Sequence, residues 1–582
     1  MKSYLHEIYI LLGEDNRRLP GIIILFLVLS MIDLVGLAII GPYVAMVSDY
    51  DYSSKVIIKV NEYIPSLLNP ENVIAFVGLS IVFLFLFKAI VGTFVNYIIA
   101  RFSVDQQTRL RVKLMRKYQS LPYQDYLKRN SSEYINSIQV RVNHYAKGVI
   151  LNSLKMISDG LVAVTLLSFL IYTNFQSVII LTAIVFPALF IYDLSFKKQL
   201  NEMGTKSNKV ISKIMSGIYE GMGGLKEVRI LGFEDYFHNK VKDNSIMYAK
   251  YQLKSTLISS IPRFLIEFLV VLCVVIIVTF VFYFTENTQS FLPTLAVFGI
   301  AAMRLVPTVS VFSKGLVSLR YNRYSVSRLY KDISNETELP SYSNKNILSS
   351  SFKSLSLNNV SFNYLESQKV SSLNKVSLKI NSGQAIGLIG ASGSGKTTLV
   401  DLILGLLKPK FGDVLYNETP LEQVISHWRS QVAYIPQEAF LIDDSLKKNV
   451  ALGVEENMID DDKLMQSLKS AKLHELAMTM KDGLNTVLGE RGVRLSGGQR
   501  QRVCLARAFY HDREVLILDE ATSALDDATQ SEIVSEIQQL KGKKTMIVIA
   551  HRLSTVEHCD FIYKLDQGKV VSKGTPAEIL SR

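Results

Sequence analysis

Long apolar stretches dominate the first 320 residues of the chain and are nearly absent beyond them. A helix rises about 1.5 Å per residue, so each stretch is long enough to cross most or all of a hydrocarbon layer of roughly 30 Å. The pattern therefore predicts six membrane-spanning helices, near residues 20–47, 73–99, 152–172, 177–193, 257–284 and 291–318.

The polar segments between these stretches set the expected orientation. Lys and Arg are concentrated in 101–149 and 194–256, whereas the short connections between spans three and four and between spans five and six carry none. Positively charged loops stay in the cytoplasm, so both chain termini are expected there. Both basic segments suit helices that continue the spans, with turns near Leu121 and Gly223 that could face another domain; solvated helical hairpins fit the pattern equally.

Composition narrows the class of protein. The formal net charge is +12, yet the basic residues lie between apolar stretches and are not interleaved with aromatic residues. That pattern indicates cytoplasmic loops beside anionic lipid, and no nucleic-acid partner is expected. The three cysteines, Cys273, Cys504 and Cys559, lack metal-ligand spacing, so neither a disulfide framework nor a zinc site is expected.

The chain changes character after residue 331. Residues 332–351 are polar and show no periodic apolar face, which indicates a linker that follows a transmembrane domain at 1–331. Beyond the linker, short β-branched runs such as AIGLIG and VLILDE alternate with helical patterns. Residues 352–582 are therefore expected to form an α/β domain with a largely parallel sheet.

A phosphate-binding loop follows one of these runs. The sequence GASGSGKTT starts at Gly390, after a strand-like run, and opens a helical pattern. Its glycines let successive backbone N–H groups surround phosphate oxygens, while Lys396 can reach the β and γ phosphates and the Thr397 hydroxyl can bind Mg²⁺. The expected ATP-binding residues here are Gly390, Ser392, Gly393, Ser394, Gly395, Lys396, Thr397 and Thr398.

Two carboxylates follow a second apolar strand. Asp519 and Glu520 end the run VLILDE. In this context Asp519 can hold Mg²⁺ through water, and Glu520 can orient or deprotonate the water that attacks the γ-phosphate. A surface Asp-Glu pair at the start of a helix is the alternative interpretation.

The sequence LSGGQRQRVCLARAF, from Leu495 to Phe509, resembles the signature of ATP-binding-cassette (ABC) proteins. The resemblance covers essentially the whole chain. It implies an all-α six-helix transmembrane domain of the ABC exporter type, followed by an α/β P-loop nucleotide-binding domain. ATP and Mg²⁺ are the implied cofactors, and the signature residues expected to contact nucleotide are Ser496, Gly497, Gly498 and Gln499.

Other short motifs match the same family in order and spacing. Tyr364 resembles the aromatic residue on which adenine stacks, Gln437 the glutamine that contacts Mg²⁺, and His551 the histidine that contacts the γ-phosphate. Residues 523–526 resemble the loop through which two ATPase domains sense each other. The sequence TVLGERG from Thr486 resembles a coupling segment of exporters.

Ser496, Gly497 and Gly498 should lie at a helix amino terminus, where free N–H groups and the helix dipole favour an anion. In the family, this helix end meets the γ-phosphate bound to the P-loop of the opposite chain. One chain carries one ATPase domain and six spans, so the resemblance implies a symmetric homodimer.

Charged residues within the predicted spans indicate what kind of substrate the transporter could carry. Lys88 and Arg304 lie near mid-span, where a cation costs about 2.5 to 3.5 kcal/mol on insertion scales. Arg263 lies four residues from Glu267, so an intrahelical pair is one interpretation, and Lys88 could likewise pair with Asp33. The other interpretation is that Lys88, Arg263 and Arg304 bind an anionic, phosphate-bearing substrate.

The membrane half is similar to bacterial flippases for lipid-linked oligosaccharides. This similarity implies ATP-driven movement of a polyprenyl pyrophosphate glycan from the cytoplasmic to the outer leaflet of the bacterial inner membrane. A lipid A or phospholipid flippase and a multidrug exporter are alternatives, and a soluble cassette ATPase is the alternative of a different class. The segment KVIIKVNEYI, Lys55–Ile64, could form an amphipathic helix on the outer surface or an ordinary loop.

Overall fold

A computed structural model describes residues 2–48, 70–173, 175–284, 292–334, 351–364, 372–520, 527–549 and 553–580. The chain divides into two compact units. The first comprises Met1–Leu121 and Arg129–Leu339, and the second comprises Pro122–Lys128 and Pro340–Arg582.

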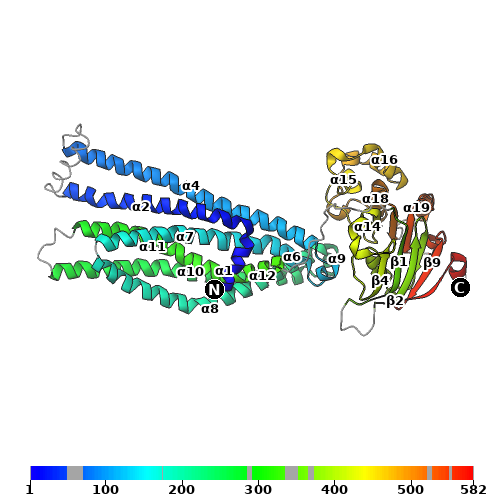
Figure 1. The fold of residues 1–582 in the computed structure, drawn as a ribbon, viewed down its shortest axis with the longest axis horizontal. Coiled ribbons are helices and arrows are strands. Elements are labelled where there is room, and N and C mark those ends of the chain that lie inside the picture. The colour runs from blue at the N-terminus through cyan, green and yellow to red at the C-terminus, as the bar shows by residue number, and fades with distance from the viewer. Residues whose placement is uncertain are drawn as a thin grey trace. The chain divides into compact units, whose positions relative to one another are not determined.

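The first unit consists of helices, the longest of which run side by side (Figure 1). Its main helices are α1 (Lys2–Leu12), α2 (Leu19–Ser48), α4 (Pro70–Gln119), α7 (Asn152–Thr173), α8 (Phe175–Gly223), α10 (Glu234–Phe284), α11 (Leu292–Tyr321) and α12 (Arg323–Ser334). Each predicted span lies on one of these helices, apart from residue 291, which is outside the described residues. By length and composition, four described stretches could cross a membrane: Ser3–Val44, Ile74–Gln119, Ser131–Tyr172 and Glu234–Leu272.

Apolar side chains cover the outside of these helices. On α4, for example, Val82, Phe83 and Leu86 are exposed, although a helix in water would present polar residues there. A helix that is apolar on its outer face needs a hydrocarbon environment, with its backbone groups bonded within the helix. The first unit is therefore a helical membrane domain.

Several helices are much longer than a hydrocarbon layer is thick. Helix α4 has 50 residues, which corresponds to about 75 Å and exceeds a hydrocarbon layer of roughly 30 Å. The predicted turns form two short helices, α5 (Tyr123–Tyr126) and α9 (Leu225–Leu231). Residues 122–128, which include α5, group with the second unit. Between α5 and α7 the chain forms α6 (Ser131–Asn136) and two π-helical segments, η2 (Ser137–Arg141) and η3 (His144–Leu151).

The end of α12 differs from the predicted linker boundary. The helix continues to Ser334, so the first three residues of the predicted linker are helical. Asp332 is buried there, and its carboxylate accepts hydrogen bonds from the Tyr118 hydroxyl at 2.7 Å and from Arg129 at 2.9 Å. These partners lie about 200 positions away in the sequence, so the local polar composition gave no sign of this burial.

The second unit contains two sheets. The predicted parallel strands lie in a six-stranded sheet of order β10-β9-β3-β8-β7-β6, in which only the β10–β9 pair is antiparallel. Its strands are β3 (Ala385–Ile389), β6 (Val432–Ile435), β7 (Val515–Asp519), β8 (Thr545–Ile549), β9 (Phe561–Asp566) and β10 (Lys569–Gly574). A four-stranded antiparallel sheet was not predicted; its strands are β1 (Ser354–Phe362), β2 (Leu373–Asn381), β4 (Phe411–Tyr416) and β5 (Thr419–Pro420).

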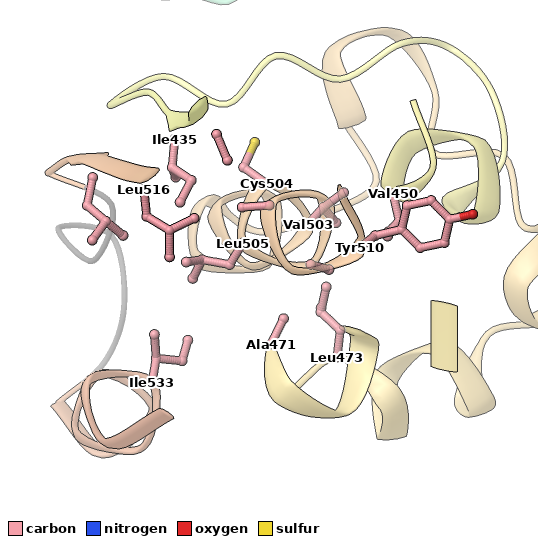
Figure 2. Packing of buried hydrophobic residues seen from close by; sticks show 14 of the residues in the cluster. Ile435, Val450, Ala471, Leu473, Val503, Cys504, Leu505, Tyr510, Leu516 and Ile533 are labelled. Atoms are coloured by element: carbon pink, nitrogen blue, oxygen red, sulfur yellow. The ribbon is translucent and has the colours of Figure 1, made fainter. Parts of the chain in front are cut away.

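One hydrophobic cluster of the second unit surrounds helix α18 (Gly497–His511). Val503 and Leu505 of α18 are fully buried, and Figure 2 shows them among apolar side chains from β6, β7 and neighbouring helices. This packing fixes the direction of α18 and hence the position of its first turn. The other helices of this unit are α13 (Lys396–Ile403), α14 (Ile425–Gln431), α15 (Leu446–Val450), α16 (Asp461–Ser470), α17 (His474–Thr479), α19 (Asp527–Gln538), α20 (Leu553–Val556) and α21 (Pro576–Leu580).

Candidate nucleotide-binding site

The glycine-rich loop joins the buried strand β3 to helix α13. Gly395 caps α13 with a φ of +103°, a conformation that residues with a Cβ rarely adopt. At Gly390, a Cβ would come within 2.3 Å of the carbonyl oxygen of Leu565. Both positions therefore require glycine, and the loop they shape leads directly into the first turn of a helix, where N–H groups can bind an anion.

Lys396 lies on the first turn of α13. Its Nζ donates hydrogen bonds to the carbonyl oxygens of Gly390, at 2.8 Å, and Ala391, at 3.0 Å. Burial lowers the pKa of Lys396, and the carboxylates of Glu520 and Asp519 act in the opposite direction. The ammonium group is therefore held over the loop close to two carboxylates.

The other predicted loop residues differ in exposure. Ser392, Gly393 and Thr397 are exposed, whereas Thr398 is buried and its hydroxyl lies 3.3 Å from that of Tyr364. Ser394 is buried, and its hydroxyl has no hydrogen-bond partner within the described part of the chain. A buried hydroxyl of this kind fits a site that receives a polar ligand.

The two predicted carboxylates follow β7, whose five residues are all buried. Asp519 ends the strand, and Glu520 has a φ of +50°, a strained conformation for a residue with a side chain. Gln437 lies just after the neighbouring strand β6, and its Nε2 donates a hydrogen bond of 2.9 Å to Glu520. The structure thus brings together four residues, Lys396, Asp519, Glu520 and Gln437, from three separate sequence motifs.

The predicted signature residues lie at the start of α18. Ser496 is the N-cap, and its hydroxyl accepts a hydrogen bond from the N–H of Gln499 at 3.2 Å. In return, the Gln499 side chain accepts a hydrogen bond from the Ser496 N–H at 2.8 Å. This capping box fixes the first turn, so Gly497 and Gly498 present backbone N–H groups at a helix amino terminus.

Two residues of the site were missed by the sequence analysis. The Tyr434 hydroxyl, on β6, donates a hydrogen bond of 3.1 Å to Asp519. Asp401 lies on α13, where burial and the nearby Asp519 carboxylate raise its pKa to about 6. Tyr434 precedes Gln437 by three residues, on the strand that pairs with β7. This closeness to a predicted site residue is the sequence feature from which Tyr434 could have been predicted.

The donor set fits a magnesium nucleotide. The Thr397 hydroxyl and the Asp519 carboxylate are oxygen donors, which Mg²⁺ prefers. The glycine loop is open at Gly393, where an added Cβ would meet no atom within 4 Å. Two predicted parts of the site, His551 and residues 523–526, lie outside the described residues.

The three predicted membrane cations have different surroundings. Lys88 on α4 forms an ion pair with Asp33 on α2, whose side chain is 0% exposed. Arg263 pairs with Glu267 at 2.9 Å on the exposed face of α10. Arg304 lies on α11, and its side chain is outside the described residues.

Lys88 also lines a cavity of about 500 Å³ between α2, α4, α7 and α11. The polar side chains around it include Asn96, Lys155, Ser158 and Asp159, and the rest of the wall is largely apolar. Lys155 was not predicted from the sequence. The cavity is thus an amphipathic chamber within the membrane domain, lined by two cations, Lys88 and Lys155, and by the carboxylate of Asp159.

These features define a class of protein: a helical membrane domain joined to a P-loop ATPase that carries a signature helix. Residues 373–523 match the family model described as ABC transporter, and residues 19–303 match the model described as ABC transporter transmembrane region. The chain therefore belongs to the ABC transporter family, as an exporter-type half-transporter whose ATPase activity is coupled to transport. The predicted fold and enzyme class are confirmed.

Curated relatives carry the name ATP-dependent lipid A-core flippase. The protein from Cupriavidus metallidurans is 28% identical over 494 residues, which cover 84% of this chain and 82% of the relative. The protein from Saccharophagus degradans is 28% identical over 513 residues, covering 87% and 85%. Among solved structures, a bacterial Atm1-family ABC exporter with ATP bound matches with a TM-score of 0.81 and 20% identity over 97% of both chains, a likeness of fold.

Proposed function

We propose that two copies of this chain form an ATP-driven flippase in the bacterial inner membrane, with both termini in the cytoplasm. Its cargo is a glycolipid with a phosphate or pyrophosphate head group, moved from the cytoplasmic to the outer leaflet. Within that class, we propose a lipid-linked oligosaccharide. A lipid A-core molecule is the second candidate, because the curated relatives carry that name.

The chamber beside Lys88 is the observation that carries the proposed cargo. It places Lys88 and Lys155 on two different helices of the membrane domain, with Asn96, Ser158 and the carboxylate of Asp159 in the same wall. Cations in a span are costly, so they are retained where they meet a counter-ion or a wet cavity. Asp33 offsets the charge of Lys88, and phosphate oxygens offer a further partner to both ammonium groups. Arg263 and Arg304 are proposed to assist along the path of the head group.

The proposed ATP site combines the residues described above. Lys396 and the loop N–H groups would bind phosphates, Tyr364 would stack on adenine, and Thr397, Asp519 and Gln437 would hold Mg²⁺. Bound Mg²⁺ would supply electrostatic stabilisation of the phosphates. Glu520 is proposed to orient the attacking water, with His551 beside the γ-phosphate.

The signature sequence supports a homodimer, because in the ABC family this turn meets the γ-phosphate bound to the glycine loop of the opposite copy. The signature turn is the amino terminus of α18, and the glycine loop leads into a different helix, α13. We propose that Ser496, Gly497, Gly498 and Gln499 of one copy complete the ATP site of the other. A symmetric pair then contains two complete sites and twelve spans.

The test uses the purified chain reconstituted in liposomes with a fluorescent pyrophosphate-linked oligosaccharide or with a lipid A-core molecule. The wild type should move the first lipid in an ATP-dependent manner, and Glu520→Gln should retain ATP binding without hydrolysis or movement. ATP-dependent movement of the lipid A-core alone would favour the second candidate. Movement of neither lipid, or unchanged movement by Glu520→Gln, would refute the proposal.

A further inference from the structure

Two side chains from the end of β6 contact the two carboxylates at the end of β7. The strands are parallel neighbours, with Ile435 paired to Leu518. Gln437 donates to Glu520 at 2.9 Å, and Tyr434, three residues earlier, donates to Asp519 at 3.1 Å. The first of these residues belongs to a motif already described, whereas Tyr434 has no assigned role.

The hydrogen bond from Tyr434 to Asp519 restricts the orientation of the Asp519 carboxylate. Asp519 is buried, and Tyr434 is exposed on one side while its hydroxyl contacts Oδ2 of Asp519. A buried carboxylate has few water molecules that could replace the tyrosine hydroxyl as a hydrogen-bond donor. Loss of this hydrogen bond is therefore costly, and the bond restricts rotation of the carboxylate about the Cβ–Cγ bond of Asp519. Strand pairing fixes the backbone of Tyr434, and the rigid aromatic ring therefore holds the hydroxyl at a fixed place beside the carboxylate.

We propose that Tyr434 is a positioning residue for hydrolysis, which holds the Asp519 carboxylate in the orientation that binds Mg²⁺ beside the nucleotide. The inference rests on the proposed function, in which Asp519 takes part in holding the metal. When a residue that hydrogen-bonds to a metal-binding side chain is removed, the metal affinity commonly falls by about 10- to 100-fold. The role is distinct from that of Gln437, which contacts the other carboxylate.

The test measures metal binding in the full chain, independently of turnover. Mn²⁺ replaces Mg²⁺ as the probe, and its binding is followed by electron paramagnetic resonance with a saturating non-hydrolysable ATP analogue. Tyr434→Phe keeps the ring and removes the hydroxyl. Tyr563→Phe is the matched control, because its hydroxyl donates to the Lys379 carbonyl at 3.2 Å, in the same domain but away from the carboxylates.

Tyr434→Phe should weaken Mn²⁺ binding at least about tenfold. Its affinity for the metal-free analogue, measured with EDTA, should equal that of the wild type, and excess Mg²⁺ should restore ATPase activity. Tyr563→Phe should behave as the wild type in every assay. If Tyr434→Phe bound Mn²⁺ with wild-type affinity, or lost affinity for the metal-free analogue equally, the inference about Tyr434 would be overturned. The proposed function would not be affected by either result. Absence of Mn²⁺ binding by the wild-type complex would overturn the proposed nucleotide site as well.

Discussion

Replacing Lys88 by methionine should destabilise the membrane domain, because it leaves a buried carboxylate without its cation. Asp33 is 0% exposed and Lys88 is 19% exposed, so the pair is largely shielded from solvent. Removing one partner of a buried ion pair costs about 3 to 5 kcal/mol. The pair at Arg263 and Glu267 differs, because these side chains are 56% and 42% exposed and are not buried among protein side chains.

The double variant Lys88→Met with Asp33→Asn separates the two roles that the sequence left open. It removes both charges, so thermal unfolding in nanodiscs should return close to the wild type, while each single variant melts several degrees lower. If Lys88 also binds cargo, stimulation of the ATPase by pyrophosphate-linked glycan should remain lost in the double variant. Full recovery of stimulation would refute a cargo role for Lys88, and single variants as stable as the wild type would refute the buried pair.

Two predictions concern the ATPase domain. Trp428 is 0% exposed and its Nε1 donates to the Ile403 carbonyl at 2.7 Å, so Trp428→Ala should cost about 3 to 5 kcal/mol of unfolding free energy in denaturant titrations, and Trp428→Phe clearly less. A small effect of Trp428→Ala would contradict this packing. The pKa of Asp401 is raised to about 6 in the folded domain, so the protonated acid stabilises the fold and this contribution is lost as pH rises through 6. Without nucleotide or metal, Asp401→Asn should therefore raise the melting temperature relative to the wild type at pH 8 more than at pH 5, and a difference independent of pH would contradict the assignment.

The sequence alone predicted those parts of the fold that are determined by residues close together in the chain. The spans are long apolar stretches, and the glycine loop and the turn at Ser496 are set by residues within a few positions of one another. The antiparallel sheet was missed because its signal is interrupted. Strand β1 carries polar Asn358 and Asn359, and its pairing with β2 shifts register between Leu357 and Val360.

Contacts that depend on tertiary register were beyond the reach of the sequence. Tyr434 meets Asp519 because β6 pairs with β7 in one particular register, although 85 positions separate the two residues. The helical end of α12 depends in the same way on Tyr118 and Arg129, which make burial of Asp332 favourable. Lys155 enters the chamber through the packing of α7 against α2 and α11.

Nucleotide bound between two copies of the chain is the central claim, and it is tested by mixing two inactive variants. Lys396→Ala removes the lysine of the glycine loop, and Ser496→Arg blocks the signature turn; both are placed in the Glu520→Gln background so that ATP is retained. A co-purified mixed dimer then contains one intact site, formed by the loop of one copy and the signature turn of the other. We predict that it retains one ATP per two chains through rapid desalting, while either variant alone retains none. Equal retention by the mixed dimer and the single variants would contradict the claim.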